Sequence, residues 1–200
     1  MSGLTYQRRT CVRPSGASVS VVVIVDQSGR TVEQLVLEAR ARVEPPDPSL
    51  GTLPDYTEGH AVIVQTPLWV WTEDPVSETA SAGTGITVSV TSQLQRIDLR
   101  LTGSDYTESW SCDEDQVQVS WEALGLSADD WMEPERFNAC HVVVERSSTG
   151  EPGNLFNLRA SAVWTFTFTV NGAGPFAIPG SVVKTADFPV DAIEYLVIED

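Results

Sequence analysis

Apolar and polar residues alternate over much of the chain after residue 85. The longest alternation covers the thirteen residues from Leu158 to Val170, with Val163 as the only exception. A period of two places the apolar side chains on one face of a β-strand. Because this strand is longer than most, we expect it to bend or to carry a bulge. Similar patterns predict further strands at 61–71, 86–91, 97–101, 117–121, 141–146, 181–188 and 192–198.

The N-terminal quarter of the chain has a different pattern. The run SVSVVVIV at 18–25 is short and β-branched, which predicts a strand buried on both faces. Thr31 and Gln34 form a capping-box pair, and apolar residues follow at helical spacing, so a helix is expected over 31–43. The two prolines after Glu44 end it, because proline lacks a backbone donor and disfavours helical geometry in the residue before it.

These patterns divide the chain into three parts. Residues 1–16 are polar and basic and are expected to form a flexible lead-in. Residues 17–58 combine the small strand–helix element with a linker rich in proline and glycine. Residues 59–200 show short strands separated by turn residues and no β-α-β alternation, so we expect one mainly β domain, a β-sandwich of seven to nine strands.

Charge and hydropathy exclude several classes of partner. Twelve basic residues against 28 acidic ones give a net charge of −16, and residues 43–200 alone carry −19. Such a surface repels phosphate backbones, so nucleic-acid binding is not expected. The longest apolar run, Val21–Val25, is far shorter than the ~20 residues of a membrane span, so none is expected in this chain. The first residues show no signal-peptide pattern.

The three cysteines, at 11, 112 and 140, do not indicate a metal site. None belongs to a C-x-x-C pair, and the whole chain has only two histidines, so a four-ligand zinc site is hard to assemble. Two interpretations of Cys112 and Cys140 stay open from the residues alone. They form either a disulfide that closes a loop of about 28 residues, or two reduced, buried thiols. Cys11 is unpaired in both cases.

The segment 104–136 carries ten acidic residues against a single arginine, Arg136. Calcium binds six to eight oxygens of clustered carboxylates and carbonyls. The weak candidates for calcium ligands are Asp113, Asp115, Asp129 and Asp130. No EF-hand spacing is present. We therefore expect a solvated acidic surface and no cofactor, with calcium as the alternative.

Candidate catalytic residues are not evident. No G-x-S-x-G elbow occurs, and His60 lies in a loop with no recognisable partner. His141 begins an apolar strand and is expected to be a packed histidine. The pair Trp69 and Trp71, like Trp164 and its strand neighbours, is expected in the core, with an aromatic platform for carbohydrate or peptide as the alternative. We assign no catalytic residue, and an enzyme is not the favoured interpretation.

Five stretches of the chain follow the order of an uncharacterised actinobacterial family. These are PLWVWTEDP (67–75), ETASAGTGITVSV (78–90), Cys112, CHVVVERSSTGEPG (140–153) and AVWTFTFTV (162–170). The chain thus resembles secreted or membrane-tethered proteins with a PKD-like, immunoglobulin-type β-sandwich. It departs from them in having Gly103-Ser104-Asp105 where they carry a Gly-Asp-Gly turn, and in showing no leader.

The resemblance implies a Cys112–Cys140 disulfide and an extracytoplasmic location, and it implies no activity. We therefore expect a non-enzymatic structural or adhesive module of the cell envelope, or a secreted one, with a protein or a cell-surface glycan as partner. The first alternative is a calcium-dependent binding domain that uses residues 104–136. The second is a carbohydrate-active enzyme with carboxylates in a loop cleft.

Overall fold

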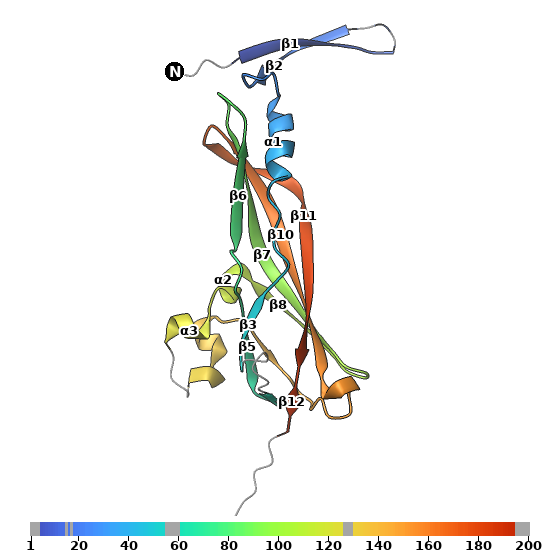
Figure 1. Ribbon diagram of the computed structural model, residues 1–200, viewed down its shortest axis with the longest axis vertical. Helices are drawn as coiled ribbons and strands as arrows, with labels where there is room; N and C mark the ends of the chain where they lie inside the picture. Colours follow the sequence, from blue (N-terminus) through green and yellow to red (C-terminus); the bar gives the residue numbers. More distant parts are fainter. Residues whose placement is uncertain (1–4, 15, 17, 55–60, 126–129, 195–200) are drawn as a thin grey trace, which may run out of the picture. The chain divides into compact units, whose positions relative to one another are not determined.

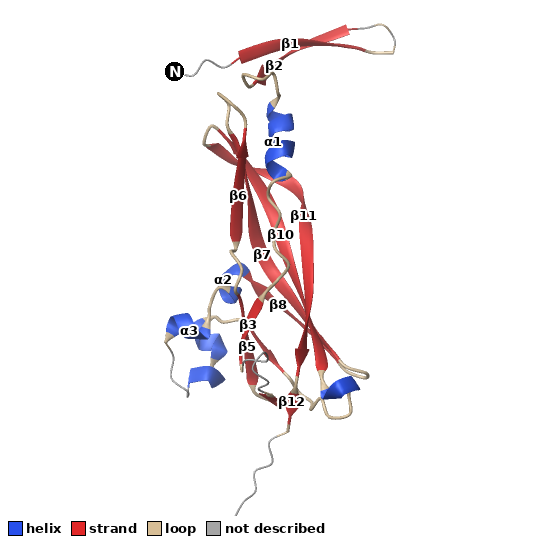
Figure 2. Cartoon of the chain, in the orientation of Figure 1, coloured by secondary structure: helices blue, strands red, loops and turns tan. Residues whose placement is uncertain are grey.

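A computed structural model describes residues 5–14, 16, 18–54, 61–125 and 130–194 (Figure 1). Strand accounts for 54% of the residues and helix for 14%, so the prediction of a mainly β protein is confirmed (Figure 2). None of the described helices is long and apolar enough to cross a membrane.

The strands are β1 (Thr5–Val12), β2 (Ser18–Val25), β3 (Leu50–Leu53), β4 (Val62–Ile63), β5 (Pro67–Thr72), β6 (Ser77–Ala82), β7 (Val88–Thr102), β8 (Thr107–Asp113), β9 (His141–Val143), β10 (Phe156–Val170), β11 (Ala173–Val190) and β12 (Ala192–Ile193). The α-helices are α1 (Val32–Arg40), α2 (Glu114–Val117) and α3 (Trp121–Leu124). Short 3-10 helices are η2 (Asp130–Met132), η3 (Pro134–Phe137) and η4 (Pro152–Asn154).

The chain folds into two compact units that share three long strands, β7, β10 and β11. The first unit comprises Met1–Pro45, Ser77–Gln93 and Thr165–Gly180. The second comprises Pro46–Val76, Leu94–Trp164 and Ser181–Asp200.

In the first unit, helix α1 packs on the sheet ordered β11–β10–β7–β6. Its side chains Leu35 and Ala39 are fully buried, and the guanidinium of Arg40 lies 3.5 Å from the ring centroid of Phe166. The predicted capping box of Thr31 and Gln34 is present, so the local signal placed the start of the helix correctly. The helix ends at Arg40, earlier than the prolines require.

The N-terminal hairpin differs from the prediction. Residues 5–12, expected within a flexible lead-in, form β1 and pair antiparallel with β2. The prediction that 18–25 is buried on both faces is wrong, because every residue of β2 up to Ile24 is exposed or half-buried. The β-branched run does form a strand, but β1 is its only partner strand among the described residues, and a single partner covers neither face of β2.

Asp26 fixes the turn between β2 and α1. Its buried carboxylate accepts hydrogen bonds from Ser28 N (2.9 Å), Ser28 Oγ (2.7 Å), Arg30 N (2.9 Å) and two guanidinium nitrogens of Arg30 (2.8 and 3.0 Å). Burial alone would raise the pKa of Asp26. The hydrogen bonds from Ser28 and Arg30 and the charge of Arg30 outweigh burial and hold that pKa well below its ordinary value.

The second unit contains two sheets and a short parallel pair. β8 pairs with β7 over 96–102, and β7 lies between β8 and β10 in the sheet. A separate antiparallel sheet has the order β3–β5–β9, and β4 pairs in parallel with β12. The central strand of this antiparallel sheet, β5, is covered on both faces. The ring of Trp69 packs against that of Phe137, with 6.0 Å between the ring centroids.

Alternation predicts the long strands well. In β7 the predicted strands 86–91 and 97–101 merge into one, and the buried positions change phase between Leu94 and Ile97. In β10 the side chains of Leu158, Ala160 and Trp164 are buried, as expected. A single strand with one shift of phase accounts for what looked like two strands in the sequence.

The strand predicted at 117–121 is wrong. Residues 114–117 form α2, in which Gln116 Oε1 accepts a hydrogen bond from Asp113 N at 3.0 Å and Val117 is buried. Asp113 and the two acids after it suit a helix N-terminus, because the helix dipole favours negative charge there. The three apolar residues at period two are too few to override these local signals.

We predict that Trp164→Ala lowers the free energy of unfolding by about 3–5 kcal/mol, the usual cost of truncating a buried large aromatic side chain. Trp164 is 2% exposed. Phe176→Ala on β11 is the control, since Phe176 is 49% exposed, and it should cost about 1 kcal/mol or less. Urea denaturation measures both. Equal losses would mean that the apolar face of β10 is not a core face.

We predict that Asp26→Asn destabilises the protein near neutral pH and that the difference from the wild type shrinks in acid. The lowered pKa of Asp26 means that its contribution is complete above the ordinary value of 3.8 and is lost as the pH falls through the lower folded-state value. Denaturant midpoints at neutral pH and well below 3.8 measure this. A difference that does not depend on pH would contradict the prediction.

Candidate functional site: a polar sheet face beside a disulfide

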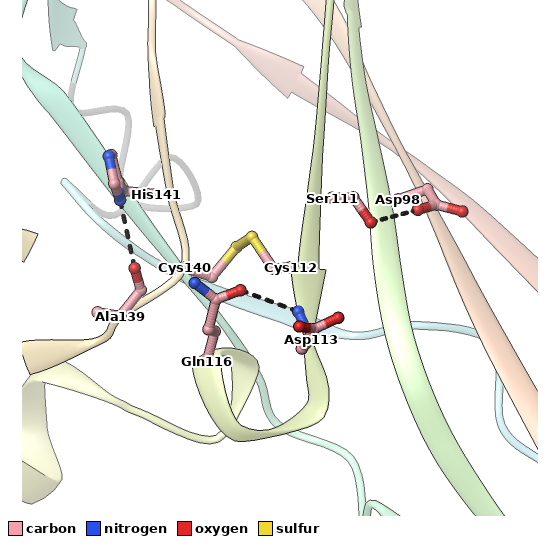
Figure 3. The surroundings of a disulfide bond; sticks show 8 residues. All are labelled: Asp98, Ser111, Cys112, Asp113, Gln116, Ala139, Cys140 and His141. Atoms are coloured by element: carbon pink, nitrogen blue, oxygen red, sulfur yellow. Dashed lines mark hydrogen bonds between the residues drawn. A yellow bond between two sulfur atoms is a disulfide. The ribbon is translucent and has the colours of Figure 1, made fainter. Parts of the chain in front are cut away.

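The disulfide between Cys112 and Cys140 lies in the second unit, and Figure 3 shows its surroundings. It joins the end of β8 to the residue before β9, with a Cα–Cα distance of 5.6 Å and both side chains buried. Cys140 O accepts a hydrogen bond from Val70 N at 3.0 Å, and Cys140 N donates to Gln116 O at 3.2 Å. The disulfide and these two hydrogen bonds together connect β8, β9, β5 and α2. Cys11 is free and exposed.

The side of β8 that faces solvent belongs to a larger polar surface. Cross-strand pairing with β7 sets Asp98 opposite Ser111 and Arg100 opposite Ser109. Ser111 Oγ donates to Asp98 Oδ1 at 2.7 Å, as Figure 3 shows, and Arg96 Nε donates to the same oxygen at 3.0 Å. Paired polar side chains of this kind stabilise neighbouring antiparallel strands. They also give this face of the sheet a fixed arrangement of donors and acceptors.

Strand β10 extends this surface. A depression of about 490 Å³ is lined by Asp98, Leu99, Arg100, Ser109, Trp110, Ser111, Arg159 and Ser161. We call its six polar residues (Asp98, Arg100, Ser109, Ser111, Arg159 and Ser161) the polar face. It combines hydroxyl groups, one carboxylate and two guanidinium groups on three adjacent strands.

Arg100 and Arg159 differ in their partners. Arg159 binds Asp187 of β11 through two parallel hydrogen bonds of 2.9 Å. The hydrogen bonds from Arg159, and a further one from Asn157, lower the pKa of Asp187. The side chain of Arg100 has no hydrogen-bond or ion-pair partner within the described part of the chain. Its guanidinium is exposed.

A second groove of about 550 Å³ adjoins the polar face, and the ion pair of Arg159 and Asp187 stands between the two. The carboxylates that line this second groove are Glu151 and Asp187. Glu151 Oε2 accepts hydrogen bonds from Ser104 N at 2.6 Å and Ser104 Oγ at 2.7 Å. Gly103 permits this contact, because a Cβ there would lie 2.6 Å from Glu151 Oε1. Both carboxylates are therefore held by hydrogen bonds.

The calcium candidates do not converge among the described residues. Asp113 ends β8 and Asp115 lies in α2, whereas Asp130 lies in η2 with Arg136 Nη1 at 3.4 Å. Asp129 lies outside the described residues. Where the chain is described, no group of three or more histidine, cysteine, aspartate or glutamate side chains could hold a metal ion.

The predicted aromatic and histidine positions are accounted for by packing. His141 is half-buried, with Nδ1 3.2 Å from Ala139 O and Nε2 3.3 Å from Glu135 Oε1. Trp71 is half-buried over Gly51, where a Cβ would lie 2.1 Å from the indole Nε1. His60 lies outside the described residues. Trp110 lies between Ser109 and Ser111 on β8 and opposite Leu99 of β7, so its side chain is on the other face of the strand from these serines.

The polar face was not predicted from the sequence. The signal was present in the polar half of the alternation, where Asp98 and Arg100 separate buried apolar residues of β7, and Arg159 and Ser161 separate buried residues of β10. Alternation assigns such residues to the solvent side, but it does not say which strands are neighbours.

No family model, no curated protein and no solved structure matches the chain. The chain is a mainly β protein with several antiparallel sheets. Its function is therefore inferred from the geometry of the site.

We predict that millimolar calcium raises the melting temperature no more than magnesium at the same ionic strength. Both ions should act only by screening repulsion among the acidic side chains. A bound calcium ion would instead stabilise by mass action, about 2.7 kcal/mol at a hundredfold excess over its dissociation constant. A calcium-specific rise that Asp113→Asn with Asp115→Asn abolishes would contradict this prediction.

Proposed function

We propose that the chain is a non-enzymatic structural or adhesive module of the cell envelope, or a secreted one, that binds a cell-surface glycan through its polar face. The observation that carries the proposal is the unpaired guanidinium of Arg100 among serine hydroxyls on a sheet secured by a disulfide. Binding residues held on rigid strands need little reorganisation when a ligand arrives.

Different observations support the proposed extracytoplasmic location and the proposed PKD-like, immunoglobulin-type sandwich. Disulfides persist in oxidising compartments and are rare in reducing ones, so Cys112–Cys140 favours an extracytoplasmic site. The proposed PKD-like, immunoglobulin-type sandwich is supported by the two sheets that this disulfide joins in the second unit. It rests otherwise on the resemblance in residues 67–170.

The chemistry of the polar face suits hydroxyl-rich ligands. Carboxylate and guanidinium groups offer paired acceptors and donors in fixed planes, and sugars present adjacent hydroxyls that match them. Arg100 supplies free donors, and Asp98 and the serines supply acceptors. An arginine without a protein partner also suits a glycan that carries a carboxylate.

The groove next to the polar face does not support catalysis of glycoside hydrolysis. That reaction needs a carboxylic acid with a raised pKa beside a second carboxylate. Asp187 has a lowered pKa because of Arg159 and Asn157, and Glu151 accepts two hydrogen bonds from Ser104. The lowered pKa of Asp187 disfavours its protonated form, so we favour binding over cleavage.

The test is binding to an array of neutral, uronic-acid-containing and sulfated oligosaccharides. Arg100→Ala should weaken binding about 10- to 100-fold, the equivalent of losing a hydrogen bond to a charged group. Arg136→Ala, which removes an exposed arginine that is paired with Asp130 and lies off the polar face, is the matched control and should leave binding unchanged. Equal loss in both variants, no binding, or hydrolysis of the bound oligosaccharide would each contradict the proposal.

A further inference from the structure

The polar face and the second groove lie on the same side of the same two strands. Along β7, Arg100 lines the depression of the polar face and Thr102 lines the second groove, and along β10 the same holds for Arg159 and Asn157. Residues two apart on a strand point to the same side of the sheet. Thr102 Oγ1 also donates a hydrogen bond to Asn157 O at 3.2 Å, which places these two positions side by side. The polar face therefore continues into the second groove along both strands.

The ion pair of Arg159 and Asp187 links the two depressions. Asp187 accepts two hydrogen bonds from Arg159 at 2.9 Å and one from Asn157 at 3.0 Å, so a residue from each depression holds the same carboxylate. The side chains of Arg159 and Asp187 are 55% and 46% exposed. A ligand that extends past the polar face thus meets polar groups whose positions are already fixed, and their ordering adds little to the cost of binding.

The two depressions differ in charge. In the lining of the polar face one carboxylate, Asp98, stands against the guanidinium groups of Arg100 and Arg159, which gives +1. The described lining of the second groove contains the carboxylates Glu151 and Asp187 and no arginine or lysine, which gives −2. The hydrogen bonds that lower the pKa of Asp187 keep it ionised near neutral pH. A ligand carboxylate is therefore attracted to Arg100 and repelled by the second groove.

The second groove also carries exposed apolar side chains beside its carboxylates. Pro152, Leu155 and Pro189 line it, and Leu155 is 41% exposed. A pyranose ring has C–H groups on its faces and hydroxyls at its edges. An uncharged ring can therefore cover this apolar surface, while its hydroxyls donate hydrogen bonds to Glu151 or Asp187.

We propose that the polar face and the second groove form one binding track, which selects an oligosaccharide of several rings with its carboxylate over Arg100 and uncharged rings in the second groove. The inference rests on the proposed function and adds to it the length of the ligand and the position of its charge. The four residues from Ser161 to Asn157 along β10 span about 13 Å, more than one sugar ring covers. Selection arises by repulsion, because Glu151 and Asp187 oppose a second carboxylate.

The experiment is isothermal titration calorimetry of the full chain with a size series of oligosaccharides. The probes are glucuronic acid linked to one, two or three uncharged hexose rings, and a tetrasaccharide with glucuronic acid at both ends. We expect the affinity to rise about tenfold from the disaccharide to the singly acidic tetrasaccharide. The doubly acidic tetrasaccharide brings a carboxylate to the second groove in either orientation, so it should bind about tenfold more weakly than the singly acidic one.

Two variants test the second groove by itself. Glu151→Gln should remove most of the preference for the singly acidic tetrasaccharide, because the amide oxygen still accepts from Ser104 but the charge is lost. Leu155→Asn should weaken the tetrasaccharide several-fold and leave the disaccharide unchanged, since it removes apolar contact only from the far rings. Glu145→Gln is the matched control, because it makes the same charge change at an exposed glutamate outside both depressions, and it should leave every affinity unchanged.

The outcomes separate this inference from the proposed function. Affinity that does not rise with length, equal affinity for the two tetrasaccharides, or equal effects of Glu151→Gln and Glu145→Gln would each overturn the inference alone, provided that binding still depends on Arg100. Binding of none of the probes, or binding that Arg100→Ala leaves unchanged, would overturn both.

Discussion

The disulfide between Cys112 and Cys140 is the constraint on which the second unit depends. It closes a separation of 28 residues, which restricts the unfolded chain by about 3–4 kcal/mol in the chain-entropy model. Through the backbone hydrogen bonds of Cys140 the same point also holds Val70 of β5 and Gln116 of α2. Strand β8 is thereby fixed at its end, and the serines that face Arg100 and Asp98 are fixed with it.

This constraint helps to explain how an acidic chain forms a local surface that also carries arginine and serine side chains. Most of the described acidic side chains of 104–136 are exposed, yet the backbone of this segment forms β8 and α2. The three arginines on or beside the polar face differ in their ion-pair partners. Arg96 and Arg159 are paired with aspartates, whereas the side chain of Arg100 is exposed and has no ion-pair partner among the described residues. The proposal of recognition rests on this arrangement of paired and unpaired guanidinium groups.

Sequence predicted what short-range physics determines. The capping box of Thr31 and Gln34 started α1 correctly, and alternation placed β10, because a period of two over many residues is typical of a β-strand alone. The prediction failed at 117–121, where the helix-favouring acids after Asp113 outweighed three apolar residues. It also failed at 18–25, because β-branched composition reports strand formation and does not report burial. The polar face depends on which strands are neighbours and in what register, and neither is encoded within one strand.

The central claim is that the polar face binds a glycan as a preformed surface. Amide hydrogen exchange, with and without the oligosaccharide that binds best on the array, tests this most directly. We expect added protection in β7, β8 and β10 around Arg100, Ser109 and Arg159, without change in η2 or η3. Protection centred on Glu151 and Ser104, or on Asp130 and its neighbours, would contradict the claim.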